Sequence, residues 1–553
     1  MTDRRTAGAA LLLALLAGCA ERSAPDEVLL VGAKIFTADT TAPWAEALLI
    51  RGERIAAVGD RPSVEAAASA GARRIDLGGR TVVPGFNDAH DHVSTALSGV
   101  SFAVVPDPLP DPPFESVADS LAALVARVEP GTWLRTTVGS RVLEDPMARR
   151  LMLDRVAPNH PVELRAWTGH GTILNSAGLR ELGLSLAEPD PLGGGFERDA
   201  SGALTGLLEE YAGYNAWKPS FGADAAAILA AFRARSEEVL PWGITSVQDM
   251  MTGMPPQLVA SLLDSLDLDV RLRLIRMPGT SPEGRILEPW QALPTRDDSW
   301  VSVSGTKWVL DGTPVERLAV MRRPYSDRPG WHGRLNFESD TLRRILEDAL
   351  AADEQPLLHA VGDSTIALAL RLMGELAPDS VWQRLRPRIE HGEGLEPDLI
   401  PLARRLGVVV VQNPSHLALG PEAALRYGPE RMPVLQPLAS LLGAGIPVAL
   451  GSDGPLNPFL NLMLAVLHPD NPSEALSMEQ AVRAYTLGSA FAEHREHEKG
   501  ALTVGRLADL AVLSQDIFSA PPPSLPGTTS VLTVVGGRAR FDPQGLWEGG
   551  AAR

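Results

Sequence analysis

The run Pro84-Gly85-Phe86-Asn87-Asp88-Ala89-His90-Asp91-His92 constrains the chain more than any other, because it sets two histidines two residues apart after an apolar stretch. Side chains two apart in a strand point the same way, so His90 and His92 would face one point. Two neutral imidazoles form half of a site for a cation such as zinc. The preceding residues 81–86 predict a buried parallel strand, whose C-terminal mouth is where α/β barrels keep their chemistry.

Four later apolar runs also end in side chains that can bind a metal. Residues 355–363, 386–392, 447–454 and 301–312 deliver His359, His391, Asp453 and Lys307. A single histidine of this kind is often a satisfied core residue, but four histidines at successive strand ends are poorly explained that way. We therefore predict six metal ligands: His90, His92, Lys307, His359, His391 and Asp453.

Lys307 needs a separate explanation, because it shares its predicted strand face with Val303, Gly305 and Val309. An ammonium facing a barrel core is costly, so it should be paired, neutral or modified. Carbamylation by carbon dioxide would make it an anionic oxygen ligand able to bridge two metals. The alternative is an unmodified lysine paired with Asp311 or a strand-end carboxylate, which would favour a single ion held by His90, His92 and other ligands.

The order His-x-His, Lys, His, His, Asp, with the phrases HAVGD, RPRIEH and GSDGP, resembles the metal-dependent amidohydrolase superfamily. The sequence is most similar to its YtcJ-like branch, which includes N-substituted formamide deformylases, and the likeness runs from about Val28 to about Asp542. The resemblance implies one or two divalent ions, with zinc as the first expectation, and carbon dioxide as the modifier of Lys307. It also implies that His170 reaches the pocket to polarise the substrate.

Three positions depart from the usual pattern of that branch. The branch usually carries Ile where Asn87 stands, and an aspartate-glycine-histidine phrase where this chain has Trp167-Thr168-Gly169-His170. It also usually has Gln-Pro near Gln412-Asn413-Pro414-Ser415-His416. These changes lie beside the expected pocket, so they bear on the substrate rather than on the metal chemistry.

The pattern of apolar runs predicts a (β/α)8 TIM-type barrel with a small β-sandwich and an inserted α/β subdomain. Helical patterns such as residues 340–351 and 365–374 mostly separate the strand candidates. Alternating stretches at 28–75, 505–513 and 530–537 predict a sandwich built from both chain ends. The eight barrel strands are expected to begin near Val82, Ile244, Val270, Val303, Leu357, Arg388, Val408 and Val448.

The first gap between these strands is too long for one crossover helix, so it should hold an inserted lid or pocket wall. We predict a lipoprotein signal peptide at 1–19, a tether at 20–27 and a composite sandwich at 28–80 and 500–545. The barrel would comprise 81–92 and 241–499, and the insert 93–240.

Asp453 is the predicted general base and then general acid to the leaving nitrogen, because a carboxylate beside an activated water can orient it and shuttle its proton. Its alternative is an N-cap of the next helix. His170 and His416 are predicted substrate contacts, and for His170 a loop histidine with a backbone partner is almost as good an explanation. Asp249 and Asp363 are expected to orient ligands. A loop with Arg322, Arg323 and Tyr325 could bind a carboxylate, but a solvated loop explains it better.

The leading functional interpretation is metal-assisted hydrolysis of a carbon–nitrogen bond, with an N-acyl or N-formyl amine as the first guess. A heterocycle deaminase would use the same residues with a single metal. A surface-anchored binding protein on an inactive scaffold is the third option, although it would have no need of both Lys307 and Asp453. The expected partner is therefore a small-molecule substrate, and the oligomeric state stays open, with a homodimer as one option.

The N-terminus predicts where in the cell the protein is located. Arg4-Arg5, an apolar stretch at 7–17 and Leu16-Ala17-Gly18-Cys19 resemble a lipoprotein signal with lipidation at Cys19, and the stretch is too short to span a bilayer. A plain signal peptide is the alternative, and twin-arginine export fits the flanking residues poorly. We expect a cell-envelope protein, held by its lipid and facing the periplasm or outer surface. The formal charge of −18 argues against nucleic acid as a partner.

Overall fold

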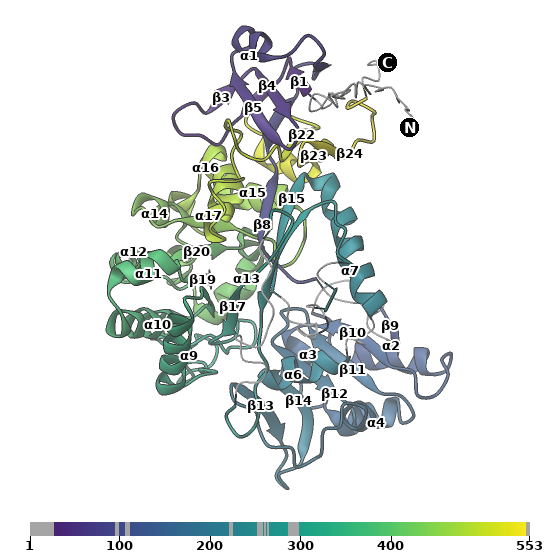
Figure 1. Cartoon of the computed structure of the whole chain (residues 1–553). Helices are drawn as coiled ribbons and strands as arrows, with labels where there is room; N and C mark the ends of the chain where they lie inside the picture. The colour runs from purple at the N-terminus through teal and green to yellow at the C-terminus, as the bar shows by residue number, and fades with distance from the viewer. Residues whose placement is uncertain are drawn as a thin grey trace, which may run out of the picture.

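Eight parallel strands form a nearly closed barrel at the centre of the computed structural model (Figure 1). The structure describes residues 27–93, 99–104, 111–220, 225–250, 258, 261–262, 265–285 and 298–548. The predicted signal peptide with Cys19 and the tether up to residue 26 lie outside the described residues. The order of the barrel strands in the sheet is their order along the chain. They are β8 (Phe86–Asp91), β15 (Ile244–Asp249), β16 (Arg271–Arg276), β17 (Val301–Val309), β18 (Pro356–Ala360), β19 (Arg388–His391), β20 (Val409–Gln412) and β21 (Val448–Leu450).

The ends of β8 and β21 meet and bring the first and last strands together. Asp453 N donates to His90 O at 2.9 Å, and Ser452 N donates to the Asp88 carboxylate at 2.8 Å. Gly451 permits this approach, because a Cβ there would lie 2.5 Å from His90 N. Parallel strands present their carboxyl ends on one face of a barrel, so this junction places His90 and Asp453 at the same mouth.

Helices that follow the strands cover the outside of the barrel. Their buried residues, such as Leu342 and Ile345 of α9 and Ile366 and Leu370 of α10, belong to one large apolar core with the strands. The helices are α7 (Ala225–Val239), α9 (Ser339–Ala352), α10 (Asp363–Leu376), α11 (Asp379–Leu385), α12 (Ile400–Leu406), α13 (Gly420–Tyr427), α14 (Leu438–Gly443), α15 (Pro458–Leu467), α16 (Met478–Arg483) and α17 (Ser489–Ala492), with short turns η1 (Leu240–Trp242), η4 (Pro414–Leu419), η5 (Met432–Val434), η6 (Pro472–Glu474) and η7 (Ala484–Gly488).

Two further sheets stack at one end of the barrel and combine both ends of the chain, purple and yellow in Figure 1. Their facing side chains, including Val28, Ile35, Leu510 and Leu532, share one apolar core. One sheet contains β5 (Arg54–Gly59), β4 (Ala47–Arg51), β1 (Glu27–Val31) and β6 (Arg73–Asp76), with α1 (Arg61–Ala67) beside it; the other contains β24 (Arg538–Phe541), β23 (Ser530–Val535), β22 (Leu510–Leu513), β7 (Thr81–Pro84), β2 (Lys34–Phe36) and β3 (Trp44–Ala45), with η8 (Pro522–Gly527) in the β22–β23 connection.

A third sheet lies at the opposite end of the molecule, between β8 and β15 along the chain (Figure 1). Its apolar residues form separate small cores with the neighbouring helices. Its strands are β13 (Gly194–Arg198), β14 (Leu204–Glu210), β12 (Gly171–Leu174), β11 (Val162–Ala166), β10 (Leu134–Val138) and β9 (Val100–Ser101), and its helices are α2 (Phe114–Val125), α3 (Ser140–Glu144), α4 (Arg150–Val156), α5 (Ser176–Glu181) and α6 (Tyr211–Ser220).

The predicted fold class, a TIM-type barrel with a two-ended sandwich and an α/β insertion, is confirmed. The strand expected near Val82 is wrong as a barrel strand, because Val82 lies in β7 and pairs with β2 and β22 of the sandwich. The first barrel strand begins at Phe86, after Gly85 packs against Thr245. Of the predicted helices, 340–351 corresponds to α9 and 365–374 to α10.

The domain boundaries stay predictions, but one observation bears on the boundary between insert and barrel. Helix α7 lies within the range expected for the insert, yet Ile228, Phe232 and Val239 pack into the large barrel core. Within the described part of the chain, the helices do not combine the length and apolar character needed to cross a bilayer.

Candidate active site

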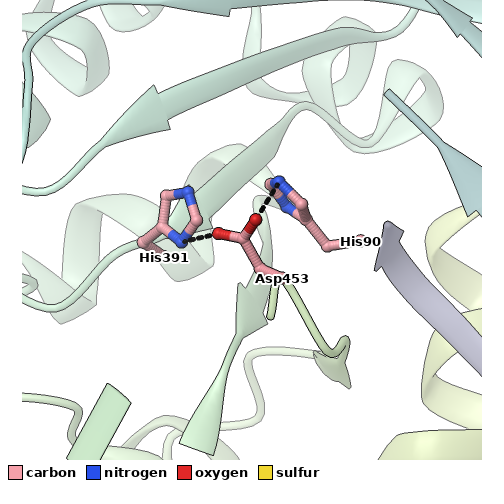
Figure 2. A group of neighbouring side chains, drawn as sticks. All are labelled: His90, His391 and Asp453. Atoms are coloured by element: carbon pink, nitrogen blue, oxygen red, sulfur yellow. Dashed lines mark ion pairs between the residues drawn. The ribbon is translucent and has the colours of Figure 1, made fainter. Parts of the chain in front are cut away.

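Five of the predicted ligands lie at the carboxyl ends of barrel strands. His90 is in β8, Lys307 near the end of β17, His359 in β18 and His391 at the end of β19, and Asp453 follows β21. Figure 2 shows His90 and His391 on either side of the Asp453 carboxylate. The parallel barrel therefore assembles side chains that are more than 360 residues apart in sequence, from His90 to Asp453.

Asp453 is the centre of this group. One carboxylate oxygen, Oδ1, lies 3.8 Å from His90 Nε2 and 3.2 Å from His92 Nε2, and the other, Oδ2, lies 3.7 Å from His391 Nδ1. Potential ligand atoms of His90, His391 and Asp453 all lie within 4.8 Å of one another. Burial alone would raise the pKa of Asp453, but the surrounding histidines hold it well below its usual value. Asp453 is therefore an ionised carboxylate that lies among three imidazoles.

The N-cap alternative for Asp453 is wrong, because the next helix, α15, has Asn457 as its N-cap. Asn457 Oδ1 accepts from Phe459 N at 3.0 Å and from Leu460 N at 3.2 Å. Asp453 instead leaves β21 with a left-handed φ of 40°, which is uncommon for a residue with a side chain. Asp453 therefore lines the cavity and does not cap the following helix.

Lys307 is buried, and its Nζ lies 3.2 Å from His90 Nε2. Burial lowers the pKa of Lys307 to about 8, so a substantial fraction is neutral near physiological pH. The alternative partner Asp311 is engaged by other groups: it accepts hydrogen bonds from the N–H groups of Val361, Gly362 and Val320 and from the Thr365 hydroxyl. Lys307 therefore faces the histidines rather than Asp311.

The surroundings of His359 show whether the candidate ligands suit a bound metal ion. Its ring centroid lies 4.5 Å from that of His391, and its Nε2 is buried with no hydrogen-bond partner among the described residues. Burying an unsatisfied polar atom is costly, and a metal ion is one group that satisfies an imidazole nitrogen. Burial also lowers the pKa of His90 to about 4 and that of His359 well below its usual value, so both rings are neutral, as ligands must be. These residues fit a divalent cation.

Side chains behind the candidate ligands fix their orientation. Glu390 Oε2 lies 2.7 Å from His90 Nδ1, and Asn413 Oδ1 lies 2.9 Å from His391 Nδ1. Both oxygens accept, so each Nδ1 carries the proton and each Nε2 is the nitrogen left for a ligand. Arg388 in turn holds Glu390 with bonds of 2.6 and 2.9 Å. This carboxylate–histidine arrangement is typical of metal sites.

Sequence reasoning missed Glu390. The signal was present, because Arg388 and Glu390 are two apart in a buried strand and therefore share a face. Asp249 and Asp363, which we expected to orient ligands, each accept a backbone hydrogen bond: Asp249 from Val93 N and Asp363 from Arg322 N, each at 2.7 Å. These contacts give no support to a role in orienting the histidines.

The candidate ligands open onto a cavity of about 600 Å³. We call the wall with His90, Lys307, His359, His391 and Asp453 the strand-end side. The facing wall comes from the inserted region and includes Trp167, Thr168, His170 and Tyr214; we call it the insert side. Between them, η4, α13 and the η5 region supply apolar groups, namely Leu417, Leu419, Ala423, Met432 and Leu435.

Both predicted substrate contacts line this cavity. His170 Nδ1 lies 2.9 Å from Glu210 Oε1, and its ring centroid is 4.9 Å from that of His359. His416 Nδ1 lies 3.1 Å from Glu393 Oε1, and its Nε2 is 3.8 Å from Asp453 Oδ2. The backbone-partner alternative for His170 is therefore not what the structure has. Burial opposes charge on both rings, yet the neighbouring carboxylates raise the pKa of His170 and of His416.

The loop with Arg322, Arg323 and Tyr325 does not contribute to this cavity among the described lining residues. Arg322 pairs with Glu396 and Asp398 at 3.3 and 3.0 Å. The buried Tyr325 hydroxyl donates to Ala319 O at 2.8 Å. The interpretation of this loop as one without a substrate role agrees with these contacts.

The parallel barrel thus brings histidines, a lysine and an aspartate together at its strand ends. The chain belongs to the amidohydrolase family, whose family model matches residues 73–541. It is similar to the N-substituted formamide deformylase of Arthrobacter pascens, with 28% identity over 556 residues, 94% of this chain and 99% of that protein. It is also similar to the putative amidohydrolase YtcJ of Bacillus subtilis, with 27% identity over 415 residues, 70% of this chain and 76% of that protein.

Solved structures share this fold. An uncharacterized metal-dependent hydrolase from Pyrococcus horikoshii superposes with a TM-score of 0.70 at 21% identity, covering 90% of this chain and 99% of that one. The family resemblance predicted from the spaced motifs is confirmed.

Proposed function

We propose that this chain is a metal-dependent hydrolase of carbon–nitrogen bonds, with an N-acyl or N-formyl amine as its substrate. The observation that carries the proposal is the convergence of His90, His391 and Asp453 within 4.8 Å. Beside them lies the buried Nε2 of His359, which has no hydrogen-bond partner in the described part of the chain. Similarity to an N-substituted formamide deformylase over nearly the whole length of both proteins supports the substrate class.

In the proposed site, His90, His92, Lys307, His359, His391 and Asp453 would hold one or two divalent ions, zinc first among them. A bound ion supplies Lewis acidity, which makes water a competent nucleophile near neutral pH and polarises the substrate carbonyl. Lys307 would contribute as a carbamate: its neutral amine attacks carbon dioxide, loses one proton and becomes an anionic oxygen ligand. The low pKa of the buried amine supports this step.

Asp453 moves the proton in this proposal. Its ionised carboxylate accepts a proton from the attacking water and returns it to the nitrogen as the carbon–nitrogen bond breaks, giving a carboxylic acid and an amine. His170 and His416 hold the substrate from the other walls of the cavity. The apolar residues of η4, α13 and the η5 region would contact an apolar substituent of the substrate.

Elemental analysis of the purified protein, combined with a hydrolysis screen, tests the proposal. We expect a bound transition metal and release of amine from N-formyl or N-acyl amines, lost on chelation and restored by zinc. Release of ammonia from a nucleobase panel instead would favour a deaminase. A protein that neither contains nor takes up metal would favour an inactive scaffold.

We also propose that Cys19 is lipid-modified and anchors the protein in the cell envelope. The motivation is the short apolar stretch that ends in Leu16-Ala17-Gly18-Cys19. Globomycin treatment or Cys19→Ala should give an unprocessed or differently fractionating protein. Unchanged fractionation under both would disprove the anchor.

A further inference from the structure

Glu210, the last residue of β14, is a buried carboxylate that the mechanism above does not use. It is 1% exposed and adopts a left-handed φ of 55°. That conformation is uncommon for a residue with a side chain and persists only where the surroundings enforce it. Such positions cluster at functional sites, so the contacts of this carboxylate deserve a functional explanation.

Those contacts centre on His170. Glu210 Oε1 and Oε2 lie 2.9 and 3.1 Å from His170 Nδ1, and Glu210 N donates to His170 O at 3.2 Å. Gly312 packs closely against the carboxylate, since a Cβ there would lie 2.4 Å from Oε1. An ionised carboxylate only accepts, so it requires the proton of His170 on Nδ1 and leaves Nε2 for the cavity.

Asn336 determines which hydrogen bonds the two carboxylate oxygens of Glu210 accept. Its Nδ2 lies 3.1 Å from Glu210 Oε2 and 3.1 Å from the Val309 carbonyl oxygen. A carbonyl oxygen can only accept, so the amide nitrogen of Asn336 faces Glu210 and donates to Oε2. The oxygen nearest His170 Nδ1, Oε1, is thus dedicated to the histidine.

We propose that Glu210 is a positioning residue for the proposed hydrolase reaction, acting through His170 by holding its ring with Nε2 toward the reacting atoms. The ring lies against His359, with centroids 4.9 Å apart, so His170 adjoins the strand-end side of the cavity. A carboxylate that sets the tautomer and orientation of a catalytic histidine is an established way to prepare a proton-transfer group. The inference rests on the proposed function only in its kinetic test, because that test needs a substrate that the protein hydrolyses.

The kinetic test is a double-mutant cycle with Glu210→Gln and His170→Ala. In Glu210→Gln the amide oxygen stays on Asn336, and the amide NH2 replaces Oε1 opposite His170 Nδ1, so the wrong tautomer is favoured. We expect kcat to fall roughly tenfold or more with a smaller change in KM, and no further loss when the change is added to His170→Ala. An equal loss in both backgrounds would overturn the proposal, as would a wild-type kcat in Glu210→Gln.

Glu209→Gln is the matched control. Glu209 precedes Glu210 in β14, but its carboxylate pairs with Arg334 at 3.3 Å. The same chemical change there should leave kcat close to that of the wild type in either background. A loss equal to that of Glu210→Gln would mean that β14, not the carboxylate, is what matters.

A second measurement is independent of any substrate. The chain has 11 histidines, so nitrogen-15 histidine labelling and long-range proton–nitrogen spectra of the metal-free protein, assigned with His170→Ala, report the protonated nitrogen of His170. We expect protonated Nδ1 in the wild type and a shift to the Nε2–H tautomer in Glu210→Gln. Protonated Nδ1 in both would overturn the proposal. If no amide is hydrolysed, this result still decides the role of Glu210, while the hydrolase proposal fails separately.

Discussion

The strand-end side and the insert side of the cavity are built in different ways. On the strand-end side, His90, His359 and His391 belong to β8, β18 and β19 of one hydrogen-bonded barrel and stay buried. On the insert side, His170 is placed by Glu210 and by Thr168, whose hydroxyl donates to Glu316. The first wall depends on the position of residues along strands, and the second on contacts that follow from how the insert docks. We therefore expect the strand-end side to govern metal and proton transfer, and the insert side substrate placement.

The largest effect is expected at Asp453. Asp453→Asn keeps the size of the side chain but cannot accept the proton that the attacking water sheds. Turnover should fall toward the upper end of roughly 10²–10⁴-fold, with much of the metal retained. Steady-state kinetics with elemental analysis measure both. A variant of normal metal content that keeps more than about a tenth of wild-type activity would remove Asp453 from proton transfer.

A change at Glu390 separates the two sides most directly. Glu390→Gln weakens the support of His90 Nδ1, so metal affinity should fall roughly 10–100-fold. Glu210→Gln supports a histidine of the insert side and should leave metal affinity close to that of the wild type. Competition with a chelator measures both, with thermal unfolding as the control because Glu390 also pairs with buried Arg388. Equal losses of affinity would contradict the division.

Lys307 gives the strand-end side a pH dependence. Burial lowers its pKa from 10.5 to about 8, so deprotonation occurs at lower pH than for an exposed lysine. For that pKa the neutral fraction is roughly 3% at about pH 6.5 and roughly 75% at about pH 8.5. Metal-free protein in carbon-13 bicarbonate should therefore show a carbamate signal that grows over this range.

Lys307→Ala controls that experiment, because the chain has three other lysines, Lys34, Lys218 and Lys499. The signal should vanish in this variant, and short carboxylates should restore part of its activity. A metal-loaded crystal with an unmodified ammonium paired to a carboxylate would disprove the modification.

The smallest effect is expected where the insert meets the barrel loops. Glu144 of α3 pairs with Arg317 and, at 3.0 Å, with Arg426, and its side chain is 43% exposed. Exposed pairs contribute little, so Glu144→Gln should cost roughly 0.2–1 kcal/mol of unfolding free energy. Urea unfolding at low and high salt checks this, because screening should shrink the difference. A loss of unfolding free energy well above this range would show that the contact between the insert and the barrel loops is as stable as the barrel.

Much of the fold could be predicted from the sequence, because barrel strands and their helices are short periodic segments. One error is instructive. The apolar run from Thr81 to Phe86 reads as one strand, yet the chain passes at Gly85 from β7 of the sandwich to β8 of the barrel. Nothing in the local pattern distinguishes the two sheets, since both bury the run.

The residues of the candidate site also differ in whether the sequence predicts them. The strand-end residues were predictable, since each lies at the end of an apolar run. The partners Asn413 and Glu210 were not, and Glu390 was missed although it adjoins His391 and shares a strand face with Arg388. Glu210 follows His170 by forty residues and meets it across a sheet, so its role depends on the order of β14, β12 and β11.

By itself, the sequence determined which residues can carry chemistry, because strand periodicity and parallel topology place strand ends at one mouth whatever the details of packing. How those residues are held depends on contacts that form only in the folded chain. The tautomers of His90, His391 and His170 depend on carboxylate and amide oxygens brought in from other strands. The closure of β8 on β21 at Gly451 likewise joins the two ends of the barrel. Hydrogen bonds act over about 3 Å, and such distances between remote segments exist only once the chain has folded.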